Sequence, residues 1–499
     1  MKIFLMEHPR KVEDYFCNDI ANTPLSSSLI TSSLHGNLAA HNHEVMVSEG
    51  FMGEKSYEEI TEEILNFKPD IMGIHMIYQW DNHVELKAFC KSIKAKMKIK
   101  IIVYGFYAAF AYKDVLESIP EVNAVIIGEP ETAFTEIAAG KILPSIPSLC
   151  YRNENKEIIK NKIEILKNLD SLAQPIRSKE ILAMRETNIE GSRGCYNNCT
   201  FCYINNYYGK KCLWRGHSVD YISQEIEMLM QNYGKNRFYF TDPNFFGPGE
   251  QGKKRCLELA KRLKPFNIKF GIEARVNDIE EKTLSALVDA GLEEILIGLE
   301  SGSQNCLDRL KKNTTVAQNE QALAILRKVG IEPNIGFIMF EPSSTLTDIR
   351  NNFEFLKDNE LLNNLKITSN MLYHNQILLQ GSECYKELKN LPSPNPYHVV
   401  LPYENTKVGI LATAMREITN ILFTAIAPIW SQYNKEGKKL LESYKKINEL
   451  YIEFFENTLC SLEKSSEINY EDLEKVTKEQ SVKIQNLVAK SLEIWKTEN

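Results

Sequence analysis

Short apolar segments alternate with helical patterns twice along this chain of 499 residues. In the first series, the segments 2–6, 44–47, 70–75, 100–104 and 124–127 read as strands, and 25–40, 56–67, 84–97 and 112–118 read as helices. Strands that are separated by helices favour a parallel sheet with helices on both faces. The sequence therefore predicts an α/β fold that begins with a doubly wound domain over residues 1–140, with any ligand at the carboxyl ends of its strands.

A second series of strands and helices begins near residue 186. The segments 187–189, 237–240, 269–275, 294–300, 332–340 and 366–372 read as strands, and 219–233, 252–263, 280–290, 315–329 and 347–359 read as helices. Six strand–helix units predict a partial barrel over residues 186–385, whose working face collects the strand ends. A cysteine-rich loop, Asp242, Arg275 and Glu300 all fall at such ends. Their coincidence makes this edge of the sheet the candidate site.

The two remaining regions carry no recognisable chemistry. Residues 141–185 contain prolines at 144, 147 and 175 and predict a connector with a small hairpin. Residues 386–499 begin with a proline-rich stretch and continue as helical patterns at 408–433, 435–460 and 470–496. We therefore expect a helical C-terminal domain, in which the apolar stripe between Tyr444 and Phe454 forms core rather than a site.

Three cysteines, Cys195, Cys199 and Cys202, follow a Gly-Ser-Arg-Gly turn at the spacing C-x3-C-x2-C. Thiolates this close in sequence can bind one small inorganic centre from a single loop, as in iron–sulfur proteins. Three ligands are one short of what a four-iron cubane needs, so one iron would stay open to an exogenous ligand. The alternatives are a chance cluster or a zinc site without its fourth ligand. Zinc sites more often combine such a pair with a second, distant pair, and this sequence shows none.

This loop, with Phe201 before its third cysteine, resembles the cluster loop of the radical S-adenosylmethionine (SAM) superfamily. Gly298-Leu-Glu-Ser-Gly302 resembles a second family motif, in which a glutamate and a serine help to hold SAM. The resemblance implies that the open iron binds the amino and carboxylate groups of SAM. The SAM contacts it implies are Phe201, Tyr203, Asp242, Arg275, Glu300 and Ser301. A strand-end cap and a barrel salt bridge are the structural alternatives for Asp242 and Arg275.

The N-terminal domain resembles the cobalamin-binding domain that precedes the radical SAM barrel in one large subfamily. The resemblance rests on residues 68–74, on Gly105 after the fourth strand and on Gly128-Glu-Pro-Glu131 after the fifth. Many relatives have Gly-Gly where this chain has Gly105-Phe106, and the Asp-x-His-x-x-Gly motif of other cobalamin proteins is absent after the first strand. The cobalamin contacts implied are His75, Met76, Ile77, Tyr78, Gly105, Phe106, Gly128, Glu129 and Glu131. Ordinary strand-end packing is the alternative for the loop at 75–80.

These resemblances imply a radical SAM enzyme with a [4Fe-4S] cluster, SAM and cobalamin. The first interpretation is a methyltransferase that acts on an unactivated carbon, or on phosphorus, of a peptide or small molecule, through a 5′-deoxyadenosyl radical and methylcobalamin. The partner implied is a low-potential electron donor of the flavodoxin or ferredoxin type. A radical cyclase or other rearrangement enzyme and a non-catalytic cobalamin- or SAM-binding sensor are the alternatives. A methylthiotransferase is disfavoured because the first 140 residues hold only Cys17 and Cys90.

The composition restricts the class further. A net charge of −7 argues against a nucleic-acid-binding surface, and no apolar run approaches the length that crosses a bilayer. Eleven cysteines, an odd number and mostly scattered, do not suggest a disulfide framework. We therefore expect neither nucleic acid nor membrane among the partners, and a location in a reducing cytoplasm, which a labile cluster would also require.

Overall fold

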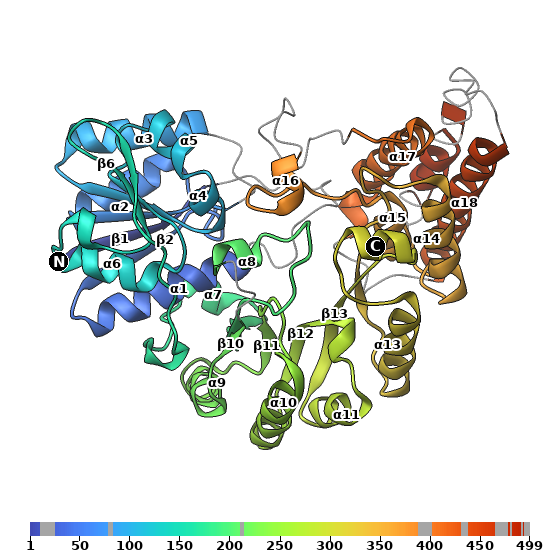
Figure 1. Ribbon diagram of the computed structural model, residues 1–499, viewed down its shortest axis with the longest axis horizontal. Coiled ribbons are helices and arrows are strands. Elements are labelled where there is room, and N and C mark those ends of the chain that lie inside the picture. Colours follow the sequence, from blue (N-terminus) through green and yellow to red (C-terminus); the bar gives the residue numbers. More distant parts are fainter. Residues whose placement is uncertain are drawn as a thin grey trace.

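The computed structural model describes residues 1–9, 25–77, 83–209, 214–387, 402–430, 438–464, 478–479, 482–490 and 493. Figure 1 shows a doubly wound domain on the left, a second sheet with its helices along the bottom, and a group of long helices at the upper right. No helix within these ranges combines the length and the apolar character needed to cross a lipid bilayer.

The N-terminal domain is a doubly wound sheet, as predicted. Its parallel strands are β1 (Lys2–Glu7), β2 (Glu44–Glu49), β3 (Ile71–His75), β4 (Lys100–Tyr104) and β5 (Ala124–Ile126), in the order β2-β1-β3-β4-β5. Its helices are α1 (Leu25–Ala40), α2 (Tyr57–Phe67), α3 (His83–Lys96), α4 (Phe106–Phe110), α5 (Tyr112–Ser118) and α6 (Pro130–Ala138). Alternate residues of β1 join separate cores, Leu5 with Leu34 of α1 and Phe4 with Ile60 of α2. The strand order reverses its direction between β1 and β3. Open sheets of this kind bind ligands at the carboxyl ends of the strands beside such a reversal.

The hairpin predicted between residues 148 and 159 is present as β6 (Leu149–Arg152) and β7 (Ile158–Lys160). It extends the N-terminal sheet to seven strands, because β6 pairs antiparallel with β5. The sheet thus continues past the boundary expected at residue 140. The short elements η1 (Leu143–Ser145), η2 (Leu169–Ser171) and α7 (Lys179–Ala183) complete the passage to the second unit.

The second unit is a parallel sheet with helices on its outside. Its strands are β8 (Thr187–Ile189), β11 (Arg237–Phe240), β12 (Lys269–Arg275), β13 (Leu292–Glu300) and β14 (Asn334–Phe337), in that spatial order. Its helices include α9 (Val219–Tyr233), α10 (Gly249–Leu263), α11 (Glu281–Asp289), α12 (Gln304–Arg309), α13 (Val316–Lys328) and α14 (Leu346–Asp358). Thr315 and Thr345 begin α13 and α14 with capping boxes, which fix where these helices start. Because all five strands are parallel, their carboxyl ends meet at one edge of the sheet.

The prediction of a sixth strand at 366–372 is wrong. This segment is the helix α15 (Leu365–Tyr373), which begins where the side chain of Asn364 accepts hydrogen bonds from the N–H groups of Lys366 and Ile367. Its apolar residues recur at helical spacing, so that Leu365, Met371 and Leu372 are buried together. An isolated parallel bridge between Phe340 and Asn375 is the only pairing that the described residues show beyond β14. The sheet therefore has five strands instead of six.

The C-terminal helices α17 (Thr406–Trp430) and α18 (Lys438–Lys464) pack on the side of the barrel (Figure 1). They contact α14 and α15, and the rings of Phe353 and Phe455 stack with their centroids 5.1 Å apart. Tyr444, Ile447, Tyr451 and Phe454 are buried in the same core as the barrel strands, as the stripe predicted. Residues 482–490 are helical, within the third helix predicted. These helices thus pack against the barrel and share its hydrophobic core.

Candidate cluster and cofactor cavity

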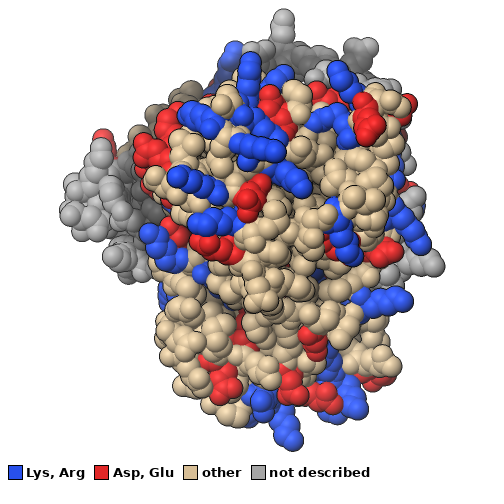
Figure 2. Space-filling view, turned by 90° about the vertical axis from the view of Figure 1, so that its left-hand side faces the viewer, with Lys and Arg blue, Asp and Glu red and all other residues tan. Residues whose placement is uncertain are grey.

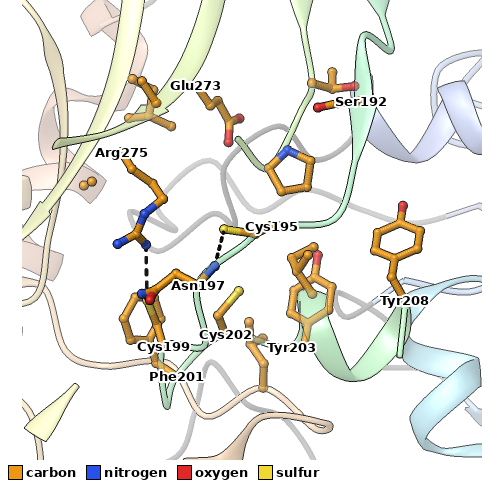
Figure 3. Close-up of a pocket in the computed structure, with 18 of the residues that line it drawn as sticks. Ser192, Cys195, Asn197, Cys199, Phe201, Cys202, Tyr203, Tyr208, Glu273 and Arg275 are labelled. Carbon is orange, nitrogen blue, oxygen red and sulfur yellow. Dashed lines mark hydrogen bonds between the residues drawn. The ribbon is translucent and has the colours of Figure 1, made fainter. Parts of the chain in front are cut away.

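The three cysteines of the loop line one cavity of about 350 Å³ at the carboxyl edge of the barrel strands (Figure 3). The loop lies between β9 (Ser192–Arg193), which pairs with β10 (Arg215–Gly216), and the short helix α8 (Ile204–Tyr207). Gly194 adopts φ +83°, a backbone conformation that favours glycine, directly before Cys195. The loop places all three thiols at the wall of one cavity, as the binding of one inorganic centre by a single loop requires.

Polar groups of the protein already surround the cysteine sulfurs. The backbone N–H of Asn197 donates to Cys195 Sγ at 3.5 Å, and Asn197 Nδ2 donates to Cys199 Sγ at 3.0 Å. Burial raises the pKa of the Cys202 thiol to about 12. Because thiolates, not thiols, bind metals, a centre bound here must displace these protons. The N–H donors would stabilise the resulting negative charge on the sulfurs.

Arg275 lies beside the cysteine loop, as its place at the end of β12 predicts. Its guanidinium is 3.6 Å from Cys199 Sγ, donates to the carbonyl oxygen of Lys312 at 2.6 Å, and lies over the ring of Tyr196 at 5.4 Å. These contacts place a buried positive charge against the thiols. The described residues show no salt bridge of Arg275, because its partners are a sulfur, a backbone carbonyl, the amide oxygen of Asn277 and a ring.

Glu300 faces the same cavity from the end of β13. Its carboxylate pairs with Lys312 Nζ at 2.8 Å, and the residue has φ +68° at an irregularity of the pairing between β13 and β14. A Cβ at Gly298 would meet the Glu300 carboxylate at 2.6 Å, so the absence of a side chain there leaves room for the pair. Gly298 of the motif thus leaves the space in which the Glu300 carboxylate reaches Lys312.

Glu273, which the sequence analysis missed, points into the cavity from β12, two residues before the end of that strand (Figure 3). Burial, together with the nearby negative charge of Asp242, raises the pKa of its carboxyl to about 8. Its buried Oε1 has no hydrogen-bond partner among the described residues. Glu300, by contrast, has Lys312 as its partner. Glu190, which also lines the cavity, is paired with Arg193. Of these three acids, Glu273 is therefore the one left to a bound ligand.

Two of the predicted SAM contacts do not line the cavity. Asp242 is fully buried behind the wall, where it accepts hydrogen bonds from the Gly191 N–H at 2.7 Å and from Ser192 Oγ at 2.8 Å. It therefore fixes the turn that leads into the cysteine loop, which is the capping role that was its alternative. Ser301 is also fully buried and donates to Asn352 Oδ1 at 2.6 Å. Phe201 and Tyr203 do line the cavity (Figure 3).

Of the predicted cobalamin contacts, Phe106 lines the described cavity. Its ring lies 5.1 Å from that of Tyr203 and so joins α4 of the N-terminal domain to the cysteine loop. His75 is fully buried: Nδ1 is 2.8 Å from a Glu7 carboxylate oxygen, and the ring stacks on Tyr104. Met76, Ile77, Gly105 and Gly128 do not line the cavity, and Tyr78 lies outside the described residues.

Glu129 and Glu131 are buried and turn their carboxylates toward two arginines. Arg193 binds both carboxylates, and Arg215 binds that of Glu129. Glu129 lies in the turn after β5, Glu131 lies in the first turn of α6, and the two arginines lie in the strand pair β9–β10, so the contact joins the N-terminal domain to the start of the second unit. No local sequence signal pairs them, because 62 positions separate Arg193 from Glu131.

The sequence model of the radical SAM superfamily matches residues 189–356. An uncharacterized methyltransferase of Pyrococcus horikoshii is 27% identical over 373 residues, 72% of this chain and 78% of the relative. An anaerobic magnesium-protoporphyrin IX monomethyl ester cyclase of Rubrivivax gelatinosus is 24% identical over 63% of this chain and 59% of its own length. These matches confirm the resemblance of the cysteine loop and of the segment at Glu300.

Two solved structures share the fold over nine-tenths or more of this chain. OxsB, described as a cobalamin-dependent SAM radical enzyme, was solved with aqua-cobalamin and SAM bound. It has a TM-score of 0.83 at 19% identity, over 100% of this chain and 81% of its own. TsrM of Kitasatospora setae, described as a radical SAM methyltransferase, has a TM-score of 0.65 at 14% identity, over 91% of this chain and 99% of its own. The order of the three regions is therefore that of these enzymes.

Proposed function

We propose that this chain, which carries the radical SAM domain of that superfamily, is a cobalamin-dependent methyltransferase. One observation carries the proposal: three cysteines line a single cavity whose wall includes residues of both the barrel and the doubly wound domain. The likeness to OxsB spans both units, and the relative from Pyrococcus horikoshii is named a methyltransferase. The substrate class we propose is a peptide or small molecule that is methylated at an unactivated carbon or at phosphorus.

The residues of the cavity fit the cofactors that the family implies. Cys195, Cys199 and Cys202 would hold a [4Fe-4S] cluster and leave one iron to SAM. Phe201, Tyr203, Arg275, Glu300 and Glu273 would contact SAM, while Asp242 and Ser301 would support the loops behind it. Phe106 would lie toward cobalamin. When bound, the cluster supplies an electron to SAM and cobalamin carries the methyl group. The electron comes from a low-potential donor, for which we propose a protein of the flavodoxin or ferredoxin type.

Glu273 predicts a pH dependence of SAM binding. Its carboxyl, with a pKa of about 8, is mostly protonated at neutral pH, and a cationic ligand favours its ionised form. Binding then releases a proton. Below about pH 8 the SAM dissociation constant should fall as pH rises, by at most about tenfold per pH unit, and it should level off above that pH.

Calorimetric titration of the reconstituted, unreduced protein with SAM at several pH values measures this effect. The Glu273→Gln variant keeps the size of the side chain and removes the proton, so it isolates the contribution of Glu273 from that of the SAM amino group. If the SAM dissociation constants of the two proteins change equally with pH, Glu273 is not part of the SAM site.

The function is tested by the products formed from SAM. After anaerobic reconstitution with iron, sulfide and hydroxocobalamin, the protein is incubated with SAM and a strong reductant. We expect S-adenosylhomocysteine, about one equivalent per bound cobalamin without substrate, together with 5′-deoxyadenosine. The relatives named cyclases favour a second candidate, a rearrangement enzyme, which would give 5′-deoxyadenosine alone. A protein that forms neither product would contradict both.

A further inference from the structure

A buried arginine joins the cysteine loop to the N-terminal domain. Arg193 lies two residues before Cys195, and its guanidinium contacts Glu131 at 2.7 Å and Glu129 at 3.0 Å, while its Nε contacts Glu190 at 2.8 Å. Arg193 and Glu131 are 3% and 1% exposed. All five N–H donors of an arginine lie in one plane, so carboxylates on several sides fix its orientation. The position of β9 is thereby tied to the turn after β5 and to the start of α6.

A second arginine completes the contact. Arg215 lies opposite Arg193 in the antiparallel pair of β9 and β10, and its guanidinium reaches Glu129 at 2.9 Å. Glu131 also accepts a hydrogen bond from Ser33 of α1 at 2.9 Å, so the acidic side of the contact is itself held in place. We call Arg193, Arg215, Glu129 and Glu131 the arginine clamp. It has two anionic members from the N-terminal domain and two cationic members from the strand pair β9–β10.

The burial of the clamp distinguishes it from the ion pairs on the surface. On the outer face of the N-terminal domain, acidic and basic side chains are interspersed and reach into solvent (Figure 2), where water and salt weaken their attraction. Arg193, Glu129 and Glu131 are buried and largely escape such screening, and removing Arg193 leaves the buried carboxylate of Glu131 without a cationic partner among the described residues. A contact of this kind holds two units in one arrangement instead of merely attracting them.

We propose that the arginine clamp is a positioning device, which sets the doubly wound domain at a fixed place over the cluster loop. Glu129 and Glu131 lie at the N-cap and in the first turn of α6, which follows β5 at the carboxyl edge where such sheets bind ligands, and Arg193 lies at the entry to the cluster loop. The clamp therefore connects the edge that would receive cobalamin with the loop that would hold the cluster. This part of the inference rests on the proposed function.

The test compares Arg193→Met with a matched control. Arg309, whose side chain is 34% exposed, binds the carboxylates of Glu341 and Asp348 within the barrel, so Arg309→Met breaks an arginine–carboxylate contact that does not join the two units. Hydrogen–deuterium exchange is measured on the reconstituted proteins, and each is titrated with hydroxocobalamin by its visible spectrum. For Arg193→Met we expect exchange about tenfold or more faster at residues 128–138 and 190–195, and a hydroxocobalamin dissociation constant about tenfold or more higher. Glu131→Gln, which keeps the shape of the side chain, should change the same peptides less.

The outcomes separate the clamp from the proposed function. If residues 128–138 exchange in Arg193→Met and Glu131→Gln as they do in Arg309→Met, the clamp does not position the domain and the inference is overturned. If the wild-type protein binds no hydroxocobalamin, the proposed function fails, while the exchange experiment still decides whether the clamp holds the two units together. Should Arg193→Met fail to fold, Glu131→Gln and Arg215→Met test the same contact from its other members.

Discussion

Replacing Cys199 by alanine is expected to abolish iron binding and SAM cleavage together. Cys199 is buried in the centre of the loop, and its sulfur receives hydrogen bonds from Asn197 and Arg275. With two thiolates left, the loop cannot hold a cubane, so the iron content should fall from about four per chain to well below one. Iron and sulfide analysis after anaerobic reconstitution measures the first effect, and 5′-deoxyadenosine formation measures the second.

Cys256→Ala is the control for this experiment. Cys256 is a fully buried cysteine of α10 that does not line the cavity, so its loss removes a thiol and some packing but no proposed ligand. It should keep the full iron content. A Cys199→Ala protein that retains about four irons, or a wild-type protein that takes up zinc in place of iron, would contradict the assignment of the cluster.

The fold could be predicted where local patterns decide it. Alternation of strands and helices implies parallel pairing, and this was sufficient for the five parallel strands of each sheet. The hairpin β6–β7 was predicted as a unit, but its pairing with β5 was not, because an edge strand accepts a neighbour for tertiary reasons that the local sequence does not express.

The error at residues 366–372 has a similar cause. Ile367 and Thr368 are β-branched and favour a strand, so the segment resembled the other barrel strands. Its helical state depends on the cap that Asn364 provides and on the packing of α15 against α17 and α18. Tertiary packing outweighed the local preference there.

The residues of the candidate site divide in the same way, into those that a local motif identifies and those whose role depends on tertiary structure. The cysteines and Glu300 belong to motifs within one loop or strand end, and sequence spacing suffices to find them. Asp242 and Glu273 are both acids near strand ends, but the direction of the side chain decides between a loop support and a cavity wall. That direction depends on the register of the strands, which the sequence does not reveal. The partners of Glu129 depend on two distant arginines for the same reason.

Replacing Arg275 by methionine should lower the reduction potential of the cluster. The guanidinium is 3.6 Å from Cys199 Sγ, so it stabilises negative charge on the cysteine loop, and one-electron reduction adds such charge. Removing the cation makes reduction less favourable. With an effective dielectric constant near 20, the shift is on the order of 50–150 mV toward more negative values. A redox titration followed by electron paramagnetic resonance measures the potential, and SAM cleavage at a fixed reductant strength should slow accordingly.

The variant Arg275→Lys separates charge from shape. A lysine keeps one positive charge but loses the planar guanidinium that spans Cys199, the carbonyl of Lys312 and the ring of Tyr196. If charge sets the potential, this variant should keep most of the wild-type value even where loop order suffers. Equal shifts for lysine and methionine would mean that the loss of hydrogen bonds, and not of charge, is responsible. An unchanged potential in both variants would place Arg275 outside the electrostatic environment of the cluster, and its contacts would then serve only to hold the loop.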